Sequence, residues 1–65
     1  MEVVVHLMQT MNLGYAEGRV SGVTGELISE DSKGVIVQTK SERNFFIPLH
    51  MIAFIEIEPQ GSDDD

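Results

Sequence analysis

The sequence predicts an all-β fold, a small and strongly bent antiparallel barrel of five strands. Apolar residues alternate with polar residues in several short segments, and short polar turns separate these segments. Glycines interrupt one of the segments, which favours a sharp bend in the chain. Because five strands must fit into 65 residues, one strongly curved sheet is the expected architecture.

The first segment, residues 2–8, fits two periods. Val3, Val5 and Leu7 alternate as they would on one face of a strand, whereas the apolar positions between 3 and 11 also fit a helical stripe. Three consecutive valines favour the strand, because β-branched side chains lose rotamer freedom in a helix and pack well on a sheet. We therefore predict a strand here.

The next stretch, residues 10–18, is predicted to be a loop, because it contains two glycines and no sustained period. Tyr15 is its one large side chain. Residues 19–28 alternate again and form the second predicted strand. Gly22 and Gly25 lie inside this strand, which indicates a bend or the close approach of another backbone.

Two further strands are predicted, joined by a hairpin turn. Residues 29–34 have the composition of a turn, and residues 35–40 alternate as a third strand. Residues 40–44 are polar and short enough for a hairpin turn. This turn leads into the fourth predicted strand, residues 44–47.

Residues 45–58 are the densest apolar stretch of the chain, and Pro48 divides it. Proline has no backbone donor and restricts the residue before it, so an unbroken central strand is not expected here. We predict a tight turn over residues 48–51 and a last strand over residues 52–58. The side chains of this strand assigned to the core are Ala53, Ile55 and Ile57.

Length and composition predict one domain over residues 1–59, followed by a disordered acidic tail over residues 60–65. The chain has no cysteine for a disulfide or a thiolate zinc site, so self-association remains as a route to bury more surface. The N-terminus has no basic leader, and no apolar run is long enough to span a bilayer. We therefore expect a cytoplasmic protein with no membrane partner.

The charge is acidic, with 11 Asp and Glu against 4 Lys and Arg and a net charge of −7. Five of the carboxylates lie at or after Glu56, so the chain through Ile55 has six acids, four bases and a net charge of −2. This is too little to exclude a phosphate-bearing partner, although strongly acidic proteins seldom bind nucleic acids.

Two stretches of the chain carry motifs of a known family. Residues 47–55, Ile-Pro-Leu-His-Met-Ile-Ala-Phe-Ile, are two predicted short strands around one turn, and Gly25-Glu26-Leu27 precedes Asp31. They resemble the second and first motifs of the Sm-like family, which includes Sm and LSm proteins and bacterial Hfq. His50-Met51-Ile52 is similar to the His-Ala-Ile of Hfq, and the size is similar to that of small phage-borne members.

The chain also departs from this family at two places. Pro48 or Leu49 stands where the family has a basic residue, and no Asn follows Asp31 at the family's spacing. The resemblance implies an SH3-like barrel and a homo-oligomeric ring of five to seven subunits, in which the fourth strand of one subunit pairs with the fifth of the next. The interface residues expected from this are Phe45, Phe46, Ile47, Phe54, Ile55 and Ile57.

The resemblance further implies that the inner rim of the ring binds single-stranded RNA, or DNA, and assists its processing or annealing without catalysis. His50 and Lys33 would then lie near the ring axis, where weak contacts repeated in every subunit add through avidity. The alternative for His50 is a structural hydrogen bond within its turn. The nucleic-acid candidates are His50, Lys33, Asp31, Tyr15 as a stacking residue in its loop, and Arg19 and Arg43 as outer phosphate contacts.

No catalytic or metal-binding arrangement is predicted. The sequence has no cysteine, no His-x-x-His spacing and no glycine-rich phosphate loop, so neither an enzyme nor a cofactor is expected. The alternative function is a protein-interaction or assembly module, an SH3-like barrel whose acidic surface docks a basic partner. The net charge favours this alternative, whereas the His50 turn and the pairing edges favour the RNA-binding ring.

Overall fold

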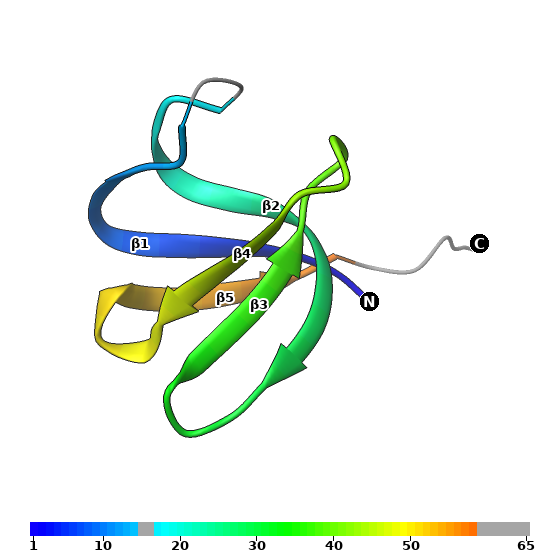
Figure 1. The fold of residues 1–65 in the computed structure, drawn as a ribbon. Helices are drawn as coiled ribbons and strands as arrows, with labels where there is room; N and C mark the ends of the chain where they lie inside the picture. Colours follow the sequence, from blue (N-terminus) through cyan, green and yellow to red (C-terminus); the bar gives the residue numbers. More distant parts are fainter. Residues whose placement is uncertain (15–16, 59–65) are drawn as a thin grey trace.

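The computed structural model describes residues 1–14 and 17–58 (Figure 1). Within these ranges it contains five strands and one short 3-10 helix, and the all-β prediction is confirmed. The elements are β1 (Glu2–Asn12), β2 (Arg19–Glu30), β3 (Gly34–Gln38), β4 (Asn44–Pro48), η1 (Leu49–Met51) and β5 (Ile52–Ile57). Tyr15 and the predicted tail, residues 60–65, lie outside the described residues.

The strands form one antiparallel sheet in the order β4-β3-β2-β1-β5. The predicted bent barrel is not closed, because β4 pairs with β3 and β5 pairs with β1, and the described residues contain no pairing between β4 and β5. The two strands are joined by η1 instead of by a shared ladder. The sheet therefore keeps two edges, one on β4 and one on β5.

The predicted strong bend is present in β2. Its first part, from Arg19 to Glu26, pairs with β1, and its last part, from Glu26 to Glu30, pairs with β3. Figure 1 shows β2 curving so that β3 and β4 cross over the side of the sheet formed by β1 and β5. The change of partner at Glu26 thus folds the sheet over its own inner face.

Gly25 lies at this bend and is required there by close backbone approach. A Cβ atom on Gly25 would lie 2.2 Å from the carbonyl oxygen of Gln38 on β3, far inside van der Waals contact. The sequence-based expectation for this glycine is confirmed. Gly34 at the start of β3 is equally confined, since its Cβ would lie 2.2 Å from the carbonyl oxygen of Ile47.

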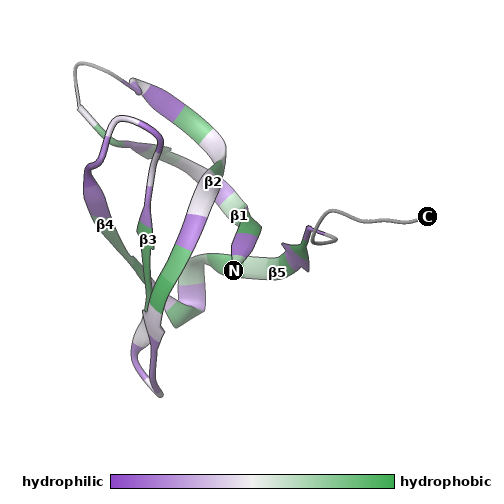
Figure 2. Cartoon of the chain, turned by 90° about the vertical axis from the view of Figure 1, so that its right-hand side faces the viewer, coloured by the Kyte–Doolittle hydropathy of each residue, from purple (hydrophilic) through white to green (hydrophobic). Residues whose placement is uncertain are grey.

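The core lies between the two halves of the bent sheet. Hydrophilic and hydrophobic residues alternate along β2, as Figure 2 shows, so one face of the strand turns inward. The buried apolar residues are Val3, Val5, Leu13, Val23, Val35, Val37 and Ile47. The valines at positions 3–5 therefore belong to a strand, as predicted, with Val3 and Val5 facing the core.

Two details of the predicted elements are wrong. β1 continues to Asn12, although the loop was expected from Thr10, because Met11 and Asn12 pair with Val20 and Arg19. In β5, Ile55 packs against the core but Ala53 is exposed and Ile57 is 61% exposed.

The register of β5 explains the second error. Phe54 lies opposite His6 and Ile52 opposite Leu7, so Ala53 falls in an irregularity of the ladder. Ile57 pairs with Val3 at the last position of an edge strand, which has a neighbour on one side only. The described residues contain no helix with the length and apolarity required to cross a bilayer.

Candidate functional site

The structure separates the predicted nucleic-acid residues into two groups at opposite ends of the sheet (Figure 1). Asp31 and Lys33 lie in the turn between β2 and β3, beside His50 in η1. Arg19 starts β2, and Arg43 directly precedes β4 at the other end. They cannot form a single cluster within one chain.

The end with Lys33 and His50 is held together by a backbone hydrogen bond. The Leu49 amide donates to the Lys33 carbonyl at 2.8 Å, so the β2–β3 turn and η1 are fixed against each other. The bond places the β2–β3 turn, which carries Lys33, next to the segment that carries His50, because His50 is the next residue after Leu49. Both side chains are exposed, and the His50 ring makes no hydrogen bond within residues 1–14 and 17–58.

Asp31 organises the turn that carries Lys33. Its Oδ1 atom accepts hydrogen bonds from the backbone amides of Lys33 at 2.8 Å and Gly34 at 3.1 Å. The Asp31 amide in turn donates to the Gly34 carbonyl at 2.9 Å. This is the local bonding by which Asp side chains stabilise turns, and it positions the Lys33 backbone for the bond from Leu49.

Arg43 joins the two loops at the opposite end. Its Nη1 atom lies 3.1 Å from Oε1 of Glu17, and its guanidinium carbon lies 5.1 Å from the centroid of the Phe45 ring. Arg19 donates to the Thr10 hydroxyl at 2.9 Å. Both arginines therefore make structural contacts, which the sequence did not predict.

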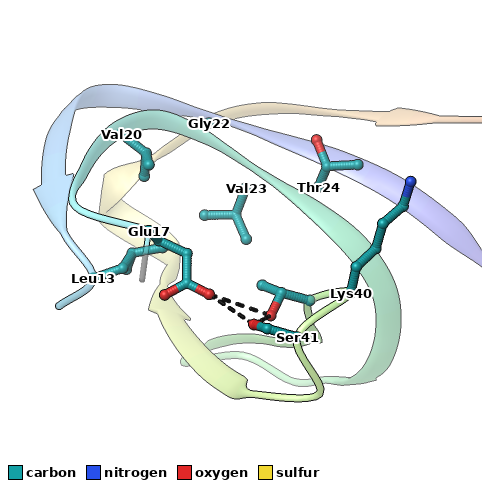
Figure 3. A pocket seen from close by; sticks show the side chains of 9 residues that line it. Leu13, Glu17, Val20, Gly22, Val23, Thr24, Lys40 and Ser41 are labelled. Carbon is teal, nitrogen blue, oxygen red and sulfur yellow. Dashed lines mark hydrogen bonds between the residues drawn. The ribbon is translucent and has the colours of Figure 1, made fainter. Parts of the chain in front are cut away.

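A pocket of about 390 Å³ lies at this same end. Figure 3 shows Val23 at its centre, Leu13 and Val20 on one side, and Thr24 and Lys40 on the other. The lining residues are Leu13, Glu17, Val20, Gly22, Val23, Thr24, Thr39, Lys40 and Ser41. They come from three separate segments of the chain, so no local motif could have revealed the pocket.

Glu17 fixes the rim of the pocket. Its Oε2 atom accepts hydrogen bonds from the Ser41 hydroxyl at 2.9 Å and the Thr39 hydroxyl at 3.5 Å, and the two hydroxyls are 2.8 Å apart (Figure 3). Glu17 is only 17% exposed. Together with its bond to Arg43, this network ties the β1–β2 loop to the β3–β4 turn and holds the pocket in shape.

The two sheet edges each present one exposed aromatic side chain. Phe46 on β4 is 49% exposed and Phe54 on β5 is 59% exposed. Each is adjacent in sequence to an inward-facing residue, Ile47 or Ile55, and so points to the outer face of the sheet. Among the predicted interface residues, Phe46, Phe54 and Ile57 are thus accessible, whereas Ile47 is buried and Phe45 and Ile55 are half-buried.

Carboxylates gather on the outer face of β2, β1 and β5. Glu26 pairs with Glu2, and the Glu58 amide donates to the Glu2 carbonyl at 3.0 Å, so the three residues form one row across the strands. Glu56 lies opposite Val4, on the adjacent row of β5. The N-terminal ammonium lies 3.6 Å from Glu26, and the Nε2 atom of His6 lies 3.2 Å from Oε1 of Glu56.

Comparison with known protein families, with curated proteins and with solved structures finds no match to this chain. Within the described residues, no three His, Asp or Glu side chains come together in a way that could hold a metal ion. The candidate sites are therefore the exposed end with Lys33 and His50, the pocket beside Glu17, and the two sheet edges.

Proposed function

We propose that the chain is an Sm-like subunit that assembles into a homo-oligomeric ring of five to seven copies and binds single-stranded RNA. In this proposal the bent sheet is an SH3-like half-barrel, and β4 of one copy pairs with β5 of the next. The RNA contacts Lys33 and His50, which the ring repeats around its axis. The ring breaks no bonds and acts by holding RNA for processing or annealing.

The observation that carries the proposal is that the sheet has two free edges and that each edge exposes one phenylalanine. β4 and β5 are the edges of the sheet, and each exposes one phenylalanine on the outer face, Phe46 and Phe54. A free edge with an exposed aromatic side chain tends to pair with another chain. Pairing β4 with β5 of a second copy would satisfy the backbone groups of both edges and bring the two aromatic side chains onto one shared face.

The Lys33 end supports the second half of the proposal. Lys33 and His50 are exposed, and the Leu49–Lys33 hydrogen bond holds their two segments together. One lysine and one imidazole bind an RNA strand weakly, but several copies on one ring raise the affinity through effective concentration. Most contacts of this kind go to phosphates, so binding should weaken as salt rises.

The assembly is tested by native mass spectrometry and light scattering of the full chain. A uniform species of five to seven copies supports the proposal, and a monomer at all concentrations overturns it. Phe46→Asp or Phe54→Asp should reduce the assembly, because each places a charge at an edge that would be buried. A Ser21→Asp variant, with its charge on exposed Ser21 of β2, which is not an edge strand, is the matched control.

RNA binding is tested by gel shift with uridine-rich and adenine-rich oligonucleotides over a range of salt concentrations. Lys33→Gln combined with His50→Ala should weaken binding and reduce its salt dependence. Ser21→Asp changes the net charge by the same one unit as Lys33→Gln and should have a much smaller effect. Absence of binding at low salt by a verified ring would count against the RNA function while leaving the assembly intact.

The row of carboxylates on β2, β1 and β5 favours a second candidate, a docking module for a basic protein segment. Glu2, Glu26 and Glu58 form this row across the outer face. Like charges at this spacing attract a cationic partner. Binding of a lysine-rich peptide that is lost in Glu2→Gln and Glu58→Gln, with no RNA binding, would support this function in place of the first.

A further inference from the structure

We propose that the pocket beside Glu17 binds one nucleotide, with the base on the apolar floor and the phosphate at Lys40. The inference rests on the proposed RNA function, because the bound strand would supply the nucleotide. It adds a separate site at the end of the sheet opposite Lys33 and His50. An RNA strand that contacts both the pocket and the Lys33–His50 end would have to run along the subunit from one end of the sheet to the other.

The floor of the pocket suits a flat, largely apolar ring. Leu13, Val20 and Val23 supply aliphatic surface from the β1–β2 loop and β2, and Gly22 adds backbone without a side chain. The volume, about 390 Å³, is within the range of roughly 300–1,000 Å³ found for small-molecule sites. The pocket is thus large enough to hold a base with its sugar.

The rim supplies polar groups of the kind that bases use. Three described donors, on Thr39, Ser41 and Arg43, point at the Glu17 carboxylate. A carboxylate has about four acceptor positions, so Glu17 can accept one further hydrogen bond from a base amino group. Its position is set in advance by the three donors, which lowers the ordering cost of binding.

One cation at this end is placed to meet a phosphate. Arg19, Lys40 and Arg43, three of the four basic residues of the chain, belong to segments at this end of the sheet, and Lys40 lines the pocket. Arg43 is paired with Glu17 and Arg19 bonds Thr10, whereas Lys40 has no hydrogen-bond or ion-pair partner among the described residues. Lys40 lines the pocket on the same side as Thr24 (Figure 3), so its ammonium is the group placed to meet the phosphate.

The experiment is an amide chemical-shift titration of the full chain with three probes: adenosine monophosphate, adenosine and ribose 5-phosphate. Adenosine monophosphate should bind more tightly than either of the others. The shifts should centre on residues 20–24 and 39–41 and spare Lys33 and His50. Lys40→Ala should weaken the binding of adenosine monophosphate by roughly threefold to tenfold. It should leave the binding of adenosine unchanged, because the substitution removes only the phosphate contact.

Lys33→Ala is the matched control, since it removes the same charge at the opposite end and should leave adenosine monophosphate binding unchanged. Val20→Phe should fill the pocket and abolish the binding of adenosine. The amide spectrum of the Val20→Phe variant reports whether this variant folds. If the variant does not fold, the comparison of Lys40→Ala with Lys33→Ala alone tests the nucleotide site.

The pocket proposal is overturned if no probe shifts the pocket amides, if the shifts centre on Lys33 or His50, or if ribose 5-phosphate binds as well as adenosine monophosphate. Oligonucleotide binding that depends on Lys33 and His50 would then leave the proposed RNA function standing. Conversely, adenosine monophosphate in the pocket without any oligonucleotide binding would support the nucleotide site and contradict the RNA function. The two failures are therefore distinguishable.

Discussion

The imidazole of His6 stacks on the ring of Phe54, with the ring centroids 4.3 Å apart and the planes 17° from parallel. The His6 Nε2 atom also lies 3.2 Å from Oε1 of Glu56. Glu56 follows Phe54 by two residues on the edge strand β5. The stack holds Phe54 against β1, so the exposed aromatic at the β5 edge has a defined position before any partner arrives.

Replacing Phe54 with alanine is expected to reduce self-association far more than monomer stability, because the side chain is 59% exposed. Loss of the stack with His6 should cost about 0.5–1.5 kcal/mol in the free energy of unfolding. Light scattering and urea denaturation measure the two effects separately. Met8→Ala is the control, since Met8 is 67% exposed on β1, which is not an edge strand, and an equal loss of assembly in this variant would contradict the role of the β5 edge.

Replacing Gly25 with alanine should destabilise the domain by about 1–3 kcal/mol or prevent folding, because the new Cβ would overlap the Gln38 carbonyl. Gly22→Ala should cost much less, since its Cβ would lie 3.3 Å from the Val5 carbonyl oxygen. Urea denaturation of the two variants gives the comparison. Equal stability of both would mean that β2 and β3 can separate at the bend without cost.

Replacing Asp31 with alanine should lower the free energy of unfolding by about 1 kcal/mol, because two backbone amides lose their acceptor. Asp31→Asn should retain most of the stability, since its amide oxygen can accept the same bonds. Glu30, the exposed carboxylate next to Asp31, offers a control, because Glu30→Ala should hardly change the free energy of unfolding. If Asp31→Ala instead weakens RNA binding without changing stability, the carboxylate has a role beyond the turn.

Arg43 and Glu17 should show a coupling of about 0.5–1 kcal/mol in a double-mutant cycle built from Arg43→Met and Glu17→Gln. The coupling should fall as salt increases, because the arginine is 44% exposed. Thermal or urea unfolding of the four proteins at two salt concentrations measures it. A coupling near zero would show that the two loops hold their positions without this ion pair.

The strands could be predicted from sequence because alternation and valine content are local signals. The pattern at positions 3–5 and the glycines of β2 predicted a strand and a close approach, and Val3, Val5 and Gly25 occupy those roles. The ends of the strands were less predictable. Asn12 continues β1 because Arg19 pairs with it, and this depends on a residue across the loop.

The candidate site could be predicted from sequence only in part. Lys33 and His50 were expected to lie close together, and the Leu49–Lys33 bond joins their segments. Glu17 was not singled out, since its partners on Thr39, Ser41 and Arg43 are more than twenty residues away. Strand count alone does not determine whether the last two strands bond each other, so it does not determine whether the sheet closes.

The two edges of the sheet are consecutive strands, joined only by the three residues of η1. In a head-to-tail assembly, the rotation between one contact surface and the next is repeated at every step and decides whether the assembly closes or grows into a filament. In the proposed ring, this short connection would therefore set the number of subunits. Insertion of one residue into η1 should change the size of the ring or open it into a filament, although every contacting side chain is unchanged.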